Sequence, residues 1–370
     1  MQLFFIGFFK FLKKFFLIFY FIKNIINLEL FYQNFSFYLT INISNNIIYI
    51  IKNYGEIMYS IGVDIGGMSV KVGLVDSNGN IVEKNVEKTI PGHINVINNI
   101  VSQVNRLLVS NNLTIKDIKG IGVGCPGAVS GEKGFIDVLP NLGWENVPLV
   151  ELLKKQLDTE IKISNDANVA ALAEAVYGVA KGVNDCVMFT LGTGVGGGVI
   201  INKKLYEGTD SKGAELGHST LIFGGKKCSC GRSGCIETYI SATALMAQTR
   251  EEMQNNPKSL MWDYVLGDIN KVDGKTAFEC AKKGDVSAEK VVSNYVAYLS
   301  ESLMNMMNIF RPQVLILGGG VSAQGDYLIN RIEEYCKKFD YGYKGAPKPQ
   351  IKIAKFGNDA GIIGAAALLA

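Results

Sequence analysis

The sequence is poor in the residues that characterise several protein classes. Its 370 residues include only 8 prolines, 2 tryptophans and 2 histidines, and charged residues make up 19%. So few prolines argue against a fibrous chain or a proline-rich disordered one. The formal net charge of +3 is too small to favour nucleic acid or an anionic membrane as the main partner. We therefore expect neither as a partner.

A complete secretory signal is also missing, and pairing two of the seven cysteines would leave five over. A disulfide framework is therefore not expected. What the chain does contain is 41 glycines and 48% hydrophobic residues. Its length is sufficient for two domains with proper cores. This profile is typical of a soluble α/β enzyme, and we expect a cytoplasmic one.

The first 57 residues have a composition of their own. They contain no Ala, Val, Pro, Arg, Asp, His, Cys or Trp, and they hold 12 of the 19 phenylalanines. AT-rich codons specify the residues that dominate this stretch. This indicates an AT-rich intergenic region upstream of the gene that has been translated in frame with it. Because the codons for Gly55 and Glu56 can spell a purine-rich ribosome-binding site, we interpret Met58 as the true start.

Residues 3–22 allow a second interpretation, because about 20 apolar residues can span a membrane. Lys10, Lys13 and Lys14 interrupt this segment, and each would be costly in the middle of a bilayer. A misassigned start is therefore favoured over a signal or anchor segment. Without residues 1–57 the chain has 32 basic and 32 acidic residues, so the remainder is formally neutral.

Two strand, glycine-loop and strand units occur in the chain. In the first, residues 59–63 lead into Asp64 and the glycines Gly66 and Gly67, and a second strand follows. In the second, residues 187–191 lead into the glycine-rich stretch 192–198 and another strand. Free amide groups in such loops bind phosphates, and neither loop carries the Gly-Lys-Ser or Gly-Lys-Thr of a Walker loop. The repeat predicts two similar lobes with a nucleotide in the cleft between them.

A short polar window combines four potential metal ligands: His218, Cys228, Cys230 and Cys235. Three thiolates and one imidazole are the ligand set of a closed structural zinc site. The alternative is a loop of three reduced cysteines that bind nothing. Because the window is polar and punctuated by glycines, zinc ligation is favoured over burial in a core.

Several polar residues stand at the ends of predicted elements. Asp166 lies just after the predicted strand 161–164, where it is interpreted as a helix cap and, compatibly with that, as a base that accepts a proton from a hydroxyl. Asn141 lies in a loop with Trp144, and this loop either contacts sugar hydroxyls or only places the indole in the core. Asp64 could hold magnesium through water.

These motifs together resemble the ROK family of sugar kinases and repressors over residues 58–370. The match is carried by the stretches 64–67, 140–141, 165–168, 191–198, 215–218, 228–237 and 318–320. The resemblance is greatest to ROK glucokinases of Gram-positive bacteria. It implies an α/β protein with the actin-like, ribonuclease H-like ATPase fold, whose two lobes flank a cleft. The expected first lobe comprises residues 58–176 and 358–370, and the second comprises residues 177–357.

The resemblance also implies roles for individual residues. Asp166 becomes the catalytic base that takes the proton from the 6-hydroxyl of the sugar. The residues expected to bind the sugar are Asn141, Asn165, Glu215, His218 and Glu237. Those expected to bind ATP are Asp64, Gly66, Gly67, Thr193, Gly194, Gly318, Gly319 and Gly320. Mg²⁺ would bridge the phosphates, and structural Zn²⁺ would hold His218.

The function expected from this resemblance is the ATP-dependent phosphorylation of glucose to glucose 6-phosphate. A fructokinase, an allose kinase and an N-acetylmannosamine kinase remain as alternatives. A sugar-responsive repressor is less favoured, because residues 1–57 lack the pattern of a helix-turn-helix. Met68 stands where the family usually has threonine, which predicts weaker ATP binding. The resemblance further implies a homodimer or homotetramer.

Overall fold

The computed structural model describes residues 27–33, 36–43, 46–52, 58–338 and 346–370. It contains two units, residues 1–57 and residues 58–370, which are described separately. In the first unit, β1 (Asn27–Gln33), β2 (Ser36–Ile43) and β3 (Asn46–Lys52) form an antiparallel sheet in that order. The hydrophobic segment 3–22 lies outside the described residues. Among those that are described, no helix is long and apolar enough to cross a membrane.

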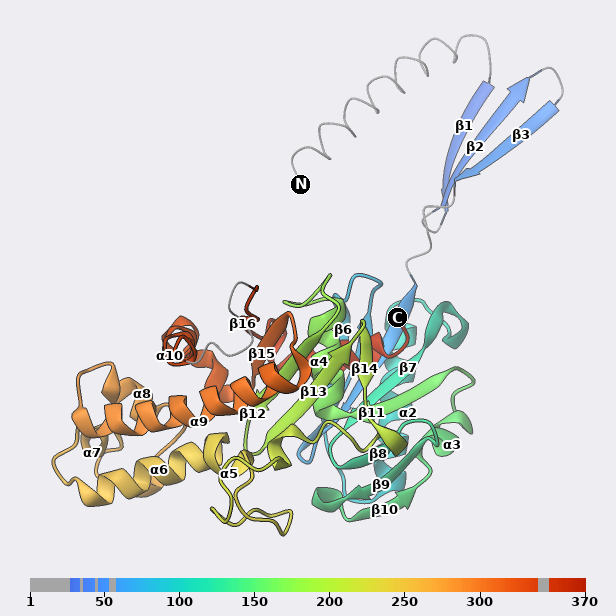
Figure 1. The fold of residues 1–370 in the computed structure, drawn as a ribbon. Coiled ribbons are helices and arrows are strands. Elements are labelled where there is room, and N and C mark those ends of the chain that lie inside the picture. The colour runs from blue at the N-terminus through green and yellow to red at the C-terminus, as the bar shows by residue number, and fades with distance from the viewer. Residues whose placement is uncertain (1–26, 34–35, 44–45, 53–57, 339–345) are drawn as a thin grey trace. The chain divides into compact units, whose positions relative to one another are not determined.

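The second unit begins with a five-stranded sheet, called here the first sheet (Figure 1). Its strands are β4 (Tyr59–Ile65), β5 (Ser69–Val75), β6 (Ile81–Lys88), β7 (Ile118–Cys125) and β11 (Ile161–Asn165). The spatial order is β11-β7-β4-β5-β6. The first three strands pair antiparallel, whereas β7 and β11 pair parallel.

A second sheet repeats this plan. Its strands are β12 (Cys186–Leu191), β13 (Val195–Ile201), β14 (Lys204–Tyr206), β15 (Val314–Gly318) and β16 (Gln350–Ile353). The spatial order is β14-β13-β12-β15-β16, again with three antiparallel strands followed by two parallel ones. The two glycine loops thus join equivalent strand pairs, and the prediction of a repeated unit is confirmed.

Two helices rich in small residues connect the sheets. α11 (Ala360–Ala367) packs on β4 and β7, and α4 (Asp166–Val176) packs on α11 and β13. Glycine permits this close approach, because a Cβ on Gly122 would lie 1.7 Å from the carbonyl oxygen of Ala365. The predicted packing of the C-terminal helix on the first sheet is therefore confirmed.

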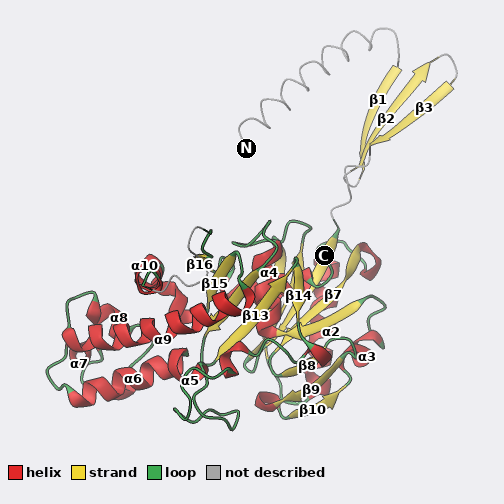
Figure 2. Ribbon diagram, in the orientation of Figure 1, coloured by secondary structure: helices red, strands yellow, loops and turns green. Residues whose placement is uncertain are grey.

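Further elements pack on each sheet, and Figure 2 shows α5 to α10 gathered beside the second one. On the first sheet lie α2 (His93–Ser110), α3 (Leu149–Lys154) and a small sheet of β8 (Ala128–Ser130), β9 (Phe135–Leu139) and β10 (Trp144–Val147). Beside the second sheet lie α5 (Glu237–Ile240), α6 (Ala242–Asn255), α7 (Leu260–Tyr264), α8 (Thr276–Ala281), α9 (Val286–Phe310) and α10 (Asp326–Cys336). Short 3-10 helices are η1 (Ile115–Asp117), η2 (Pro140–Leu142), η3 (Thr209–Ser211), η4 (Leu216–His218), η5 (Ile269–Lys271), η6 (Gly320–Gln324) and η7 (Gly357–Asp359).

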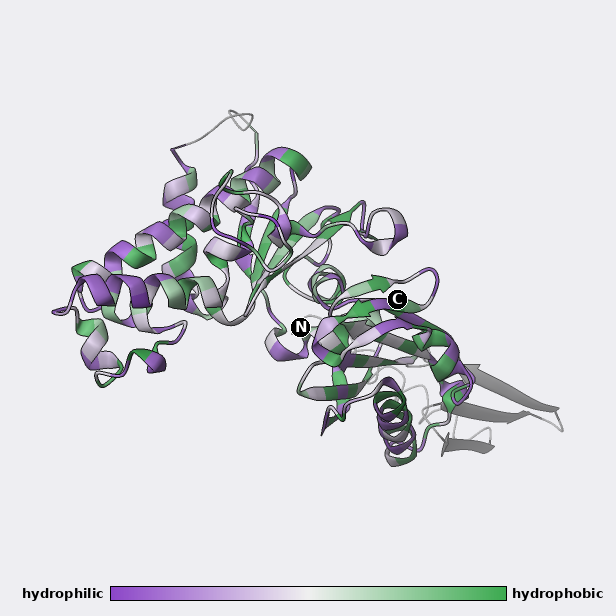
Figure 3. Cartoon of the chain, turned by 90° about the horizontal axis from the view of Figure 1, so that it is seen from below, coloured by the Kyte–Doolittle hydropathy of each residue, from purple (hydrophilic) through white to green (hydrophobic). Residues whose placement is uncertain are grey.

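Each sheet has its own hydrophobic core, and Figure 3 shows hydrophobic residues along the strands of both sheets. Trp144 is only 3% exposed and belongs to the first core. Its indole therefore fills the interior, as one interpretation of this loop expects, and the predicted sugar contact of Asn141 stays a prediction. Removing this much apolar surface from water is the main favourable term in folding.

Candidate functional site

Asp166 lies where β11 ends and α4 begins. The helix cap is Asn165, whose side-chain oxygen accepts the amide hydrogen of Ala167 at 2.8 Å. The interpretation of Asp166 as the cap is therefore wrong, because Asp166 is already the first helical residue. Asn165 also donates its side-chain N–H to the carbonyl oxygen of Gly127 at 3.1 Å, which fixes the turn before Asp166.

The Asp166 carboxyl reaches solvent, yet it lies deep among protein atoms. This desolvation raises the pKa of Asp166, and the negative charges of Asp64 and Glu215 raise it further. The amide of Ala167 partly opposes the shift by donating a hydrogen bond. A carboxylate with a raised pKa is a better proton acceptor than an ordinary aspartate.

The first glycine loop is held by its own backbone and by Thr89. The amide of Gly66 donates to the carbonyl oxygen of Ser69 at 2.9 Å, and the Thr89 hydroxyl donates to the carbonyl oxygen of Gly66 at 2.7 Å. Gly67 and Met68 are exposed, with 89% of Met68 accessible. The loop is thus ordered while its tip remains free to meet a ligand.

Asp64 pairs with a lysine that the sequence analysis did not select. The ammonium of Lys71 lies 2.8 Å from Oδ2 of Asp64, and the two residues are register partners on β4 and β5. The hairpin predicts this pair. When Ile65 pairs with Val70 across the loop, the next residues outward, Asp64 and Lys71, lie opposite each other. The lysine places a positive charge beside the first glycine loop.

The second glycine loop is tied to one of the predicted sugar ligands. Oε2 of Glu237 accepts the amide hydrogen of Val195 at 3.0 Å, and a Cβ on Gly194 would lie 2.5 Å from that oxygen. Gly194 is therefore needed for the carboxylate to approach. Thr193, at the loop tip, is exposed, and its carbonyl oxygen accepts the hydroxyl hydrogen of Thr243 at 2.8 Å.

The third glycine stretch lies beside the end of β12. A Cβ on Gly319 would lie 2.5 Å from the carbonyl oxygen of Leu191, and the residue has a φ of 82°. Both the space and the conformation require glycine there. Gly318 is buried at the end of β15, whereas Gly320 is exposed and has open space around it.

The four potential metal ligands come together in space. One ligand atom each from His218, Cys228, Cys230 and Cys235 lies within 4.8 Å of the others. The Sγ atoms of Cys230 and Cys235 are 3.7 Å apart, and Sγ of Cys228 is 3.6 Å from Nδ1 of His218. These three free cysteines and His218 are together called the cysteine knot below, a name that here implies no disulfide.

The cysteine knot adjoins the predicted sugar ligands. Sγ of Cys228 lies 3.6 Å from Oε1 of Glu237, whose other oxygen meets the second glycine loop. Glu215 comes directly before η4, which carries His218, and its charge acts on Asp166. Asn141 is exposed on η2, and its Cβ lies 4.0 Å from the position of a Cβ on Gly67.

Glu207 is a further residue that the sequence did not single out. Its Oε1 accepts the hydroxyl hydrogen of Ser164 at 2.5 Å and an amide hydrogen of Asn168 at 3.4 Å. These two partners stand two residues before and two residues after Asp166. Because Glu207 lies more than 35 residues away along the chain, no local pattern could have indicated this contact.

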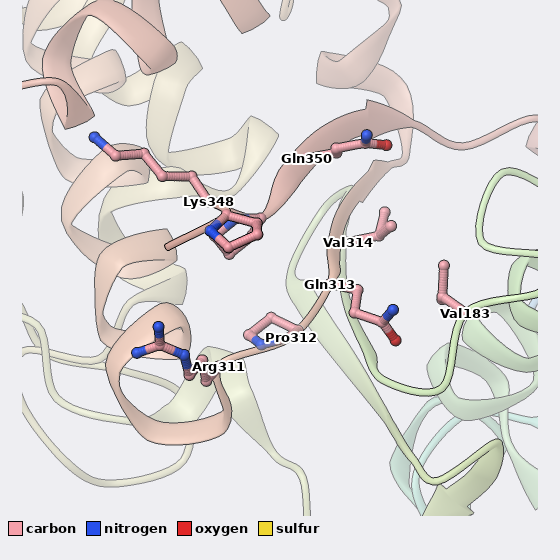
Figure 4. A pocket seen from close by; sticks show the side chains of 9 residues that line it. Val183, Arg311, Pro312, Gln313, Val314, Lys348 and Gln350 are labelled. Atoms are coloured by element: carbon pink, nitrogen blue, oxygen red, sulfur yellow. The ribbon is translucent and has the colours of Figure 1, made fainter. Parts of the chain in front are cut away.

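A separate hollow of about 400 Å³ lies where β15 and β16 begin (Figure 4). Its lining comprises Val183, Arg311, Pro312, Gln313, Val314, Pro347, Lys348, Pro349 and Gln350. None of the predicted site residues lines it. Since its lining contains no carboxylate, it offers no base for a hydroxyl.

Comparison with known proteins matches residues 60–370 to the ROK family. The chain belongs to the ROK family. The Glucokinase of Thermotoga maritima is 35% identical over 84% of this chain and 96% of its own length. The Glucokinase of Halalkalibacterium halodurans is 34% identical over 82% of this chain and 92% of its own length. Xylose repressors match at lower identity, for example 28% for that of Bacillus subtilis.

Solved ROK structures match the fold as well. The crystal structure of a ROK family glucokinase from Streptomyces griseus in complex with glucose and AMPPNP is 30% identical to this chain. It superposes with a TM-score of 0.71 and covers 84% of this chain and 98% of its own. Structures of ROK sugar kinases have the actin-like ATPase fold, so the predicted family and fold class are both confirmed.

Proposed function

We propose that this ROK protein transfers the γ-phosphoryl group of ATP to the 6-hydroxyl of glucose. The observation that carries the proposal is the Asp166 carboxyl, whose pKa is raised and which shares its surroundings with Asp64 and Glu215. The curated relatives bear out the prediction of a glucokinase. Phosphoryl transfer needs mainly alignment and charge neutralisation, with one base for the hydroxyl proton.

In this proposal Asp166 accepts the proton of the 6-hydroxyl as the oxygen attacks the γ-phosphorus. The other hydroxyls of the sugar bind to Asn141, Asn165, Glu215, His218 and Glu237. The phosphates bind to Gly66, Gly67, Thr193 and Gly194, and the adenosine lies beside Gly318, Gly319 and Gly320. Closure of the lobes would exclude water from the γ-phosphate.

The cysteine knot fits a zinc ion. Zinc–sulfur bonds of about 2.3 Å in a tetrahedron give sulfur–sulfur edges of about 3.8 Å, close to the 3.7 Å between Cys230 and Cys235. A shorter zinc–nitrogen bond of about 2.0 Å gives an edge of about 3.5 Å, close to the 3.6 Å between Cys228 and His218. Bound zinc would fix the ring of His218 and so position the sugar-binding residues beside it.

Magnesium fits the acidic surroundings of the phosphate loops. Asp64 and Asp166 bring negative charge to the place proposed for the ATP phosphates, and a divalent cation would neutralise it. One oxygen of Asp64 already meets the ammonium of Lys71. A contact between Asp64 and magnesium through water therefore fits better than direct ligation.

The division into lobes at residues 58–176 plus 358–370 and 177–357 is part of the proposal. The two separate cores and the repeated sheets support it. A homodimer or homotetramer and a cytoplasmic location are also proposed, on the family resemblance. Light scattering after size-exclusion chromatography would give the number of subunits.

A sugar panel tests the proposed substrate. We expect glucose to give the highest kcat/KM in an ADP-release assay that also includes fructose, allose, mannose and N-acetylmannosamine. Sites that bind hydroxyl groups can discriminate strongly between such sugars. A higher kcat/KM for another sugar would replace glucose as the substrate. The absence of any sugar phosphate, together with binding to a DNA operator, would favour the repressor alternative.

A further inference from the structure

A buried glutamate contacts both segments that join the two lobes. The outward segment is residues 177–185, between α4 and β12, and the return segment is residues 354–359, between β16 and α11. Glu174 lies on α4 just before the outward segment, and its side chain is 0% exposed. Neither the sequence motifs nor the proposed reaction assigns it a role.

The carboxylate of Glu174 accepts three backbone hydrogen bonds. Oε2 accepts the amide hydrogen of Val179, in the outward segment, at 3.0 Å. Oε1 accepts the amide hydrogens of Lys355 and Phe356, in the return segment, at 2.7 and 3.0 Å. The side chain of Lys352 adds a link, since its ammonium donates to the carbonyl oxygen of Val179 at 3.1 Å. One carboxylate thus holds the two segments side by side.

The outward segment is shaped to admit this carboxylate. A Cβ on Gly178 would lie 2.0 Å from Oε2 of Glu174. Gly178 is not among the glycines with positive φ, so space rather than backbone conformation requires glycine there. Hydrogen bonds to a charged acceptor are roughly twice as strong as neutral ones, and a buried carboxylate without partners would be costly. The three amides are therefore held firmly.

We propose that Glu174 is a positioning residue that makes the outward and return segments turn together as one hinge. Hinges consist of a few residues at element ends that absorb the backbone rotation. If the two segments were not joined, the lobes could approach along several paths. Joined by Glu174, they approach along one path that brings the γ-phosphate to the sugar hydroxyl. This inference rests on the proposed closure of the lobes.

Glu174→Gln tests the hinge with little change in size. The glutamine side chain keeps one oxygen that can accept a hydrogen bond, but its NH₂ group replaces the other oxygen. Because that NH₂ group faces a backbone N–H and cannot accept from it, one of the two segments loses its hydrogen bond to residue 174. Since misplacing the reacting groups by about 1 Å can cost 100-fold in rate, we expect kcat to fall about tenfold. The affinity for AMPPNP alone should stay within about twofold of the wild-type value, because without glucose the binding of AMPPNP does not depend on closure of the lobes. Small-angle scattering should show less compaction on adding glucose and AMPPNP.

Gly178→Ala provides a second variant from the opposite side of the same contact. The added methyl group would lie 2.0 Å from Oε2 and 2.7 Å from Cα of Glu174, so it displaces the carboxylate and the end of α4, and we expect the same loss of kcat and of compaction. In the double variant with Glu174→Gln, the loss of kcat should be smaller than the two separate losses combined, because both substitutions break the same contact. This variant decides the matter if Glu174→Gln does not fold.

Glu252→Gln serves as the matched control. Glu252 is also buried, at 8% exposure, and it binds Lys290 and Asn256 within the second lobe. We expect a lower Tm with kcat and compaction unchanged. If the wild-type protein does not compact with ligands, the proposed closure fails and the hinge with it. If the wild-type protein compacts and Glu174→Gln behaves like the control, only the hinge inference is overturned.

Discussion

At the scale of single residues, the environment of Asp166 links activity to stability. Desolvation raises the pKa of this carboxyl above the ordinary value of 3.8, so the folded protein binds the proton more tightly than the unfolded chain does. The contribution of Asp166 to stability is then complete below about pH 3.8 and is lost as the pH rises through the raised folded pKa. At neutral pH the deprotonated carboxylate of Asp166 destabilises the fold, and this same deprotonated form is the one that the proposed base requires.

Asp166→Asn should therefore separate these two effects. We expect kcat to fall by about 100-fold or more, since a general base contributes about that much, while glucose still binds. The Tm should rise at pH 7, because the amide carries no charge to desolvate, and the gain should shrink as the pH falls toward 4. Calorimetry and a coupled assay over this range measure both. Activity like that of the wild-type protein would remove Asp166 as the base.

The same pKa shift affects the rate of the wild-type enzyme. The base is active only when it is deprotonated, so kcat/KM should rise with pH through a pKa above the ordinary aspartate range. This rising limb should be absent from the residual activity of Asp166→Asn. A limb that persists in the variant would belong to another group.

Met68 is a second residue with a measurable consequence. It occupies the tip of the first glycine loop and is almost fully exposed, so a threonine there could offer a hydroxyl to a phosphate. Met68→Thr should lower the KM for ATP about fivefold, which corresponds to one neutral hydrogen bond of about 1 kcal/mol. Met68→Leu, which adds no hydroxyl, should leave the KM unchanged. Equal KM values for all three proteins would contradict this expectation.

At the scale of elements, the cysteine knot adjoins a proposed sugar ligand. Its ligands lie between residues 218 and 235, and Glu237 follows at the start of α5. Cys228 touches the carboxylate that also receives the amide of Val195 in the second glycine loop. A change in the knot is therefore passed directly to a proposed sugar ligand.

Cys228→Ser should lower the bound zinc and raise the KM for glucose. Residues that support a site in this way typically change affinity by about 10-fold to 100-fold, and we expect the lower end of this range. Metal analysis and steady-state kinetics measure the two effects. Cys336→Ser, at a cysteine outside the knot, should change neither. No zinc in the wild-type protein, or an unchanged KM for glucose, would end the proposed role of the knot.

The start of α4 illustrates how an element presents the proposed base. Asn165 satisfies the amide of Ala167 and anchors the preceding turn through Gly127. On either side, Ser164 and Asn168 bind Glu207. The backbone around Asp166 is thus fixed by its neighbours, which leaves the carboxyl of Asp166 available for the proposed proton transfer.

At the scale of the whole molecule, residues 58–370 form a unit with its own sheets and cores. A chain that starts at Met58 should therefore fold, because a domain with its own core can fold alone, and its kcat and KM for glucose should lie within about twofold of those of the full chain, because every residue proposed for the site lies within residues 58–370. N-terminal sequencing of the native protein tests the predicted start. A first residue upstream of Met58, or loss of activity on truncation, would contradict it.

The sequence alone was sufficient for the family, the repeated glycine hairpins and the grouping of His218 with three cysteines. These features are local: strand alternation, glycine in tight loops and closely spaced ligands follow from neighbouring residues. The pairing of Asp64 with Lys71 was also within reach, because hairpin register is set by the loop between the strands. By contrast, the sequence pointed to Asp166 as the cap of α4, and the structure assigned the cap to Asn165.

Only the tertiary structure placed Glu207 beside the turn of Asp166 and Glu174 between the two crossing segments. Glu174 and Lys355 are 181 residues apart, and they meet because α4, α11 and the second sheet pack together. The raised pKa of Asp166 has the same origin, since burial and the charges of Asp64 and Glu215 exist only in the folded chain. The residue types come from the sequence, but burial and long-range contacts arise only when the lobes assemble.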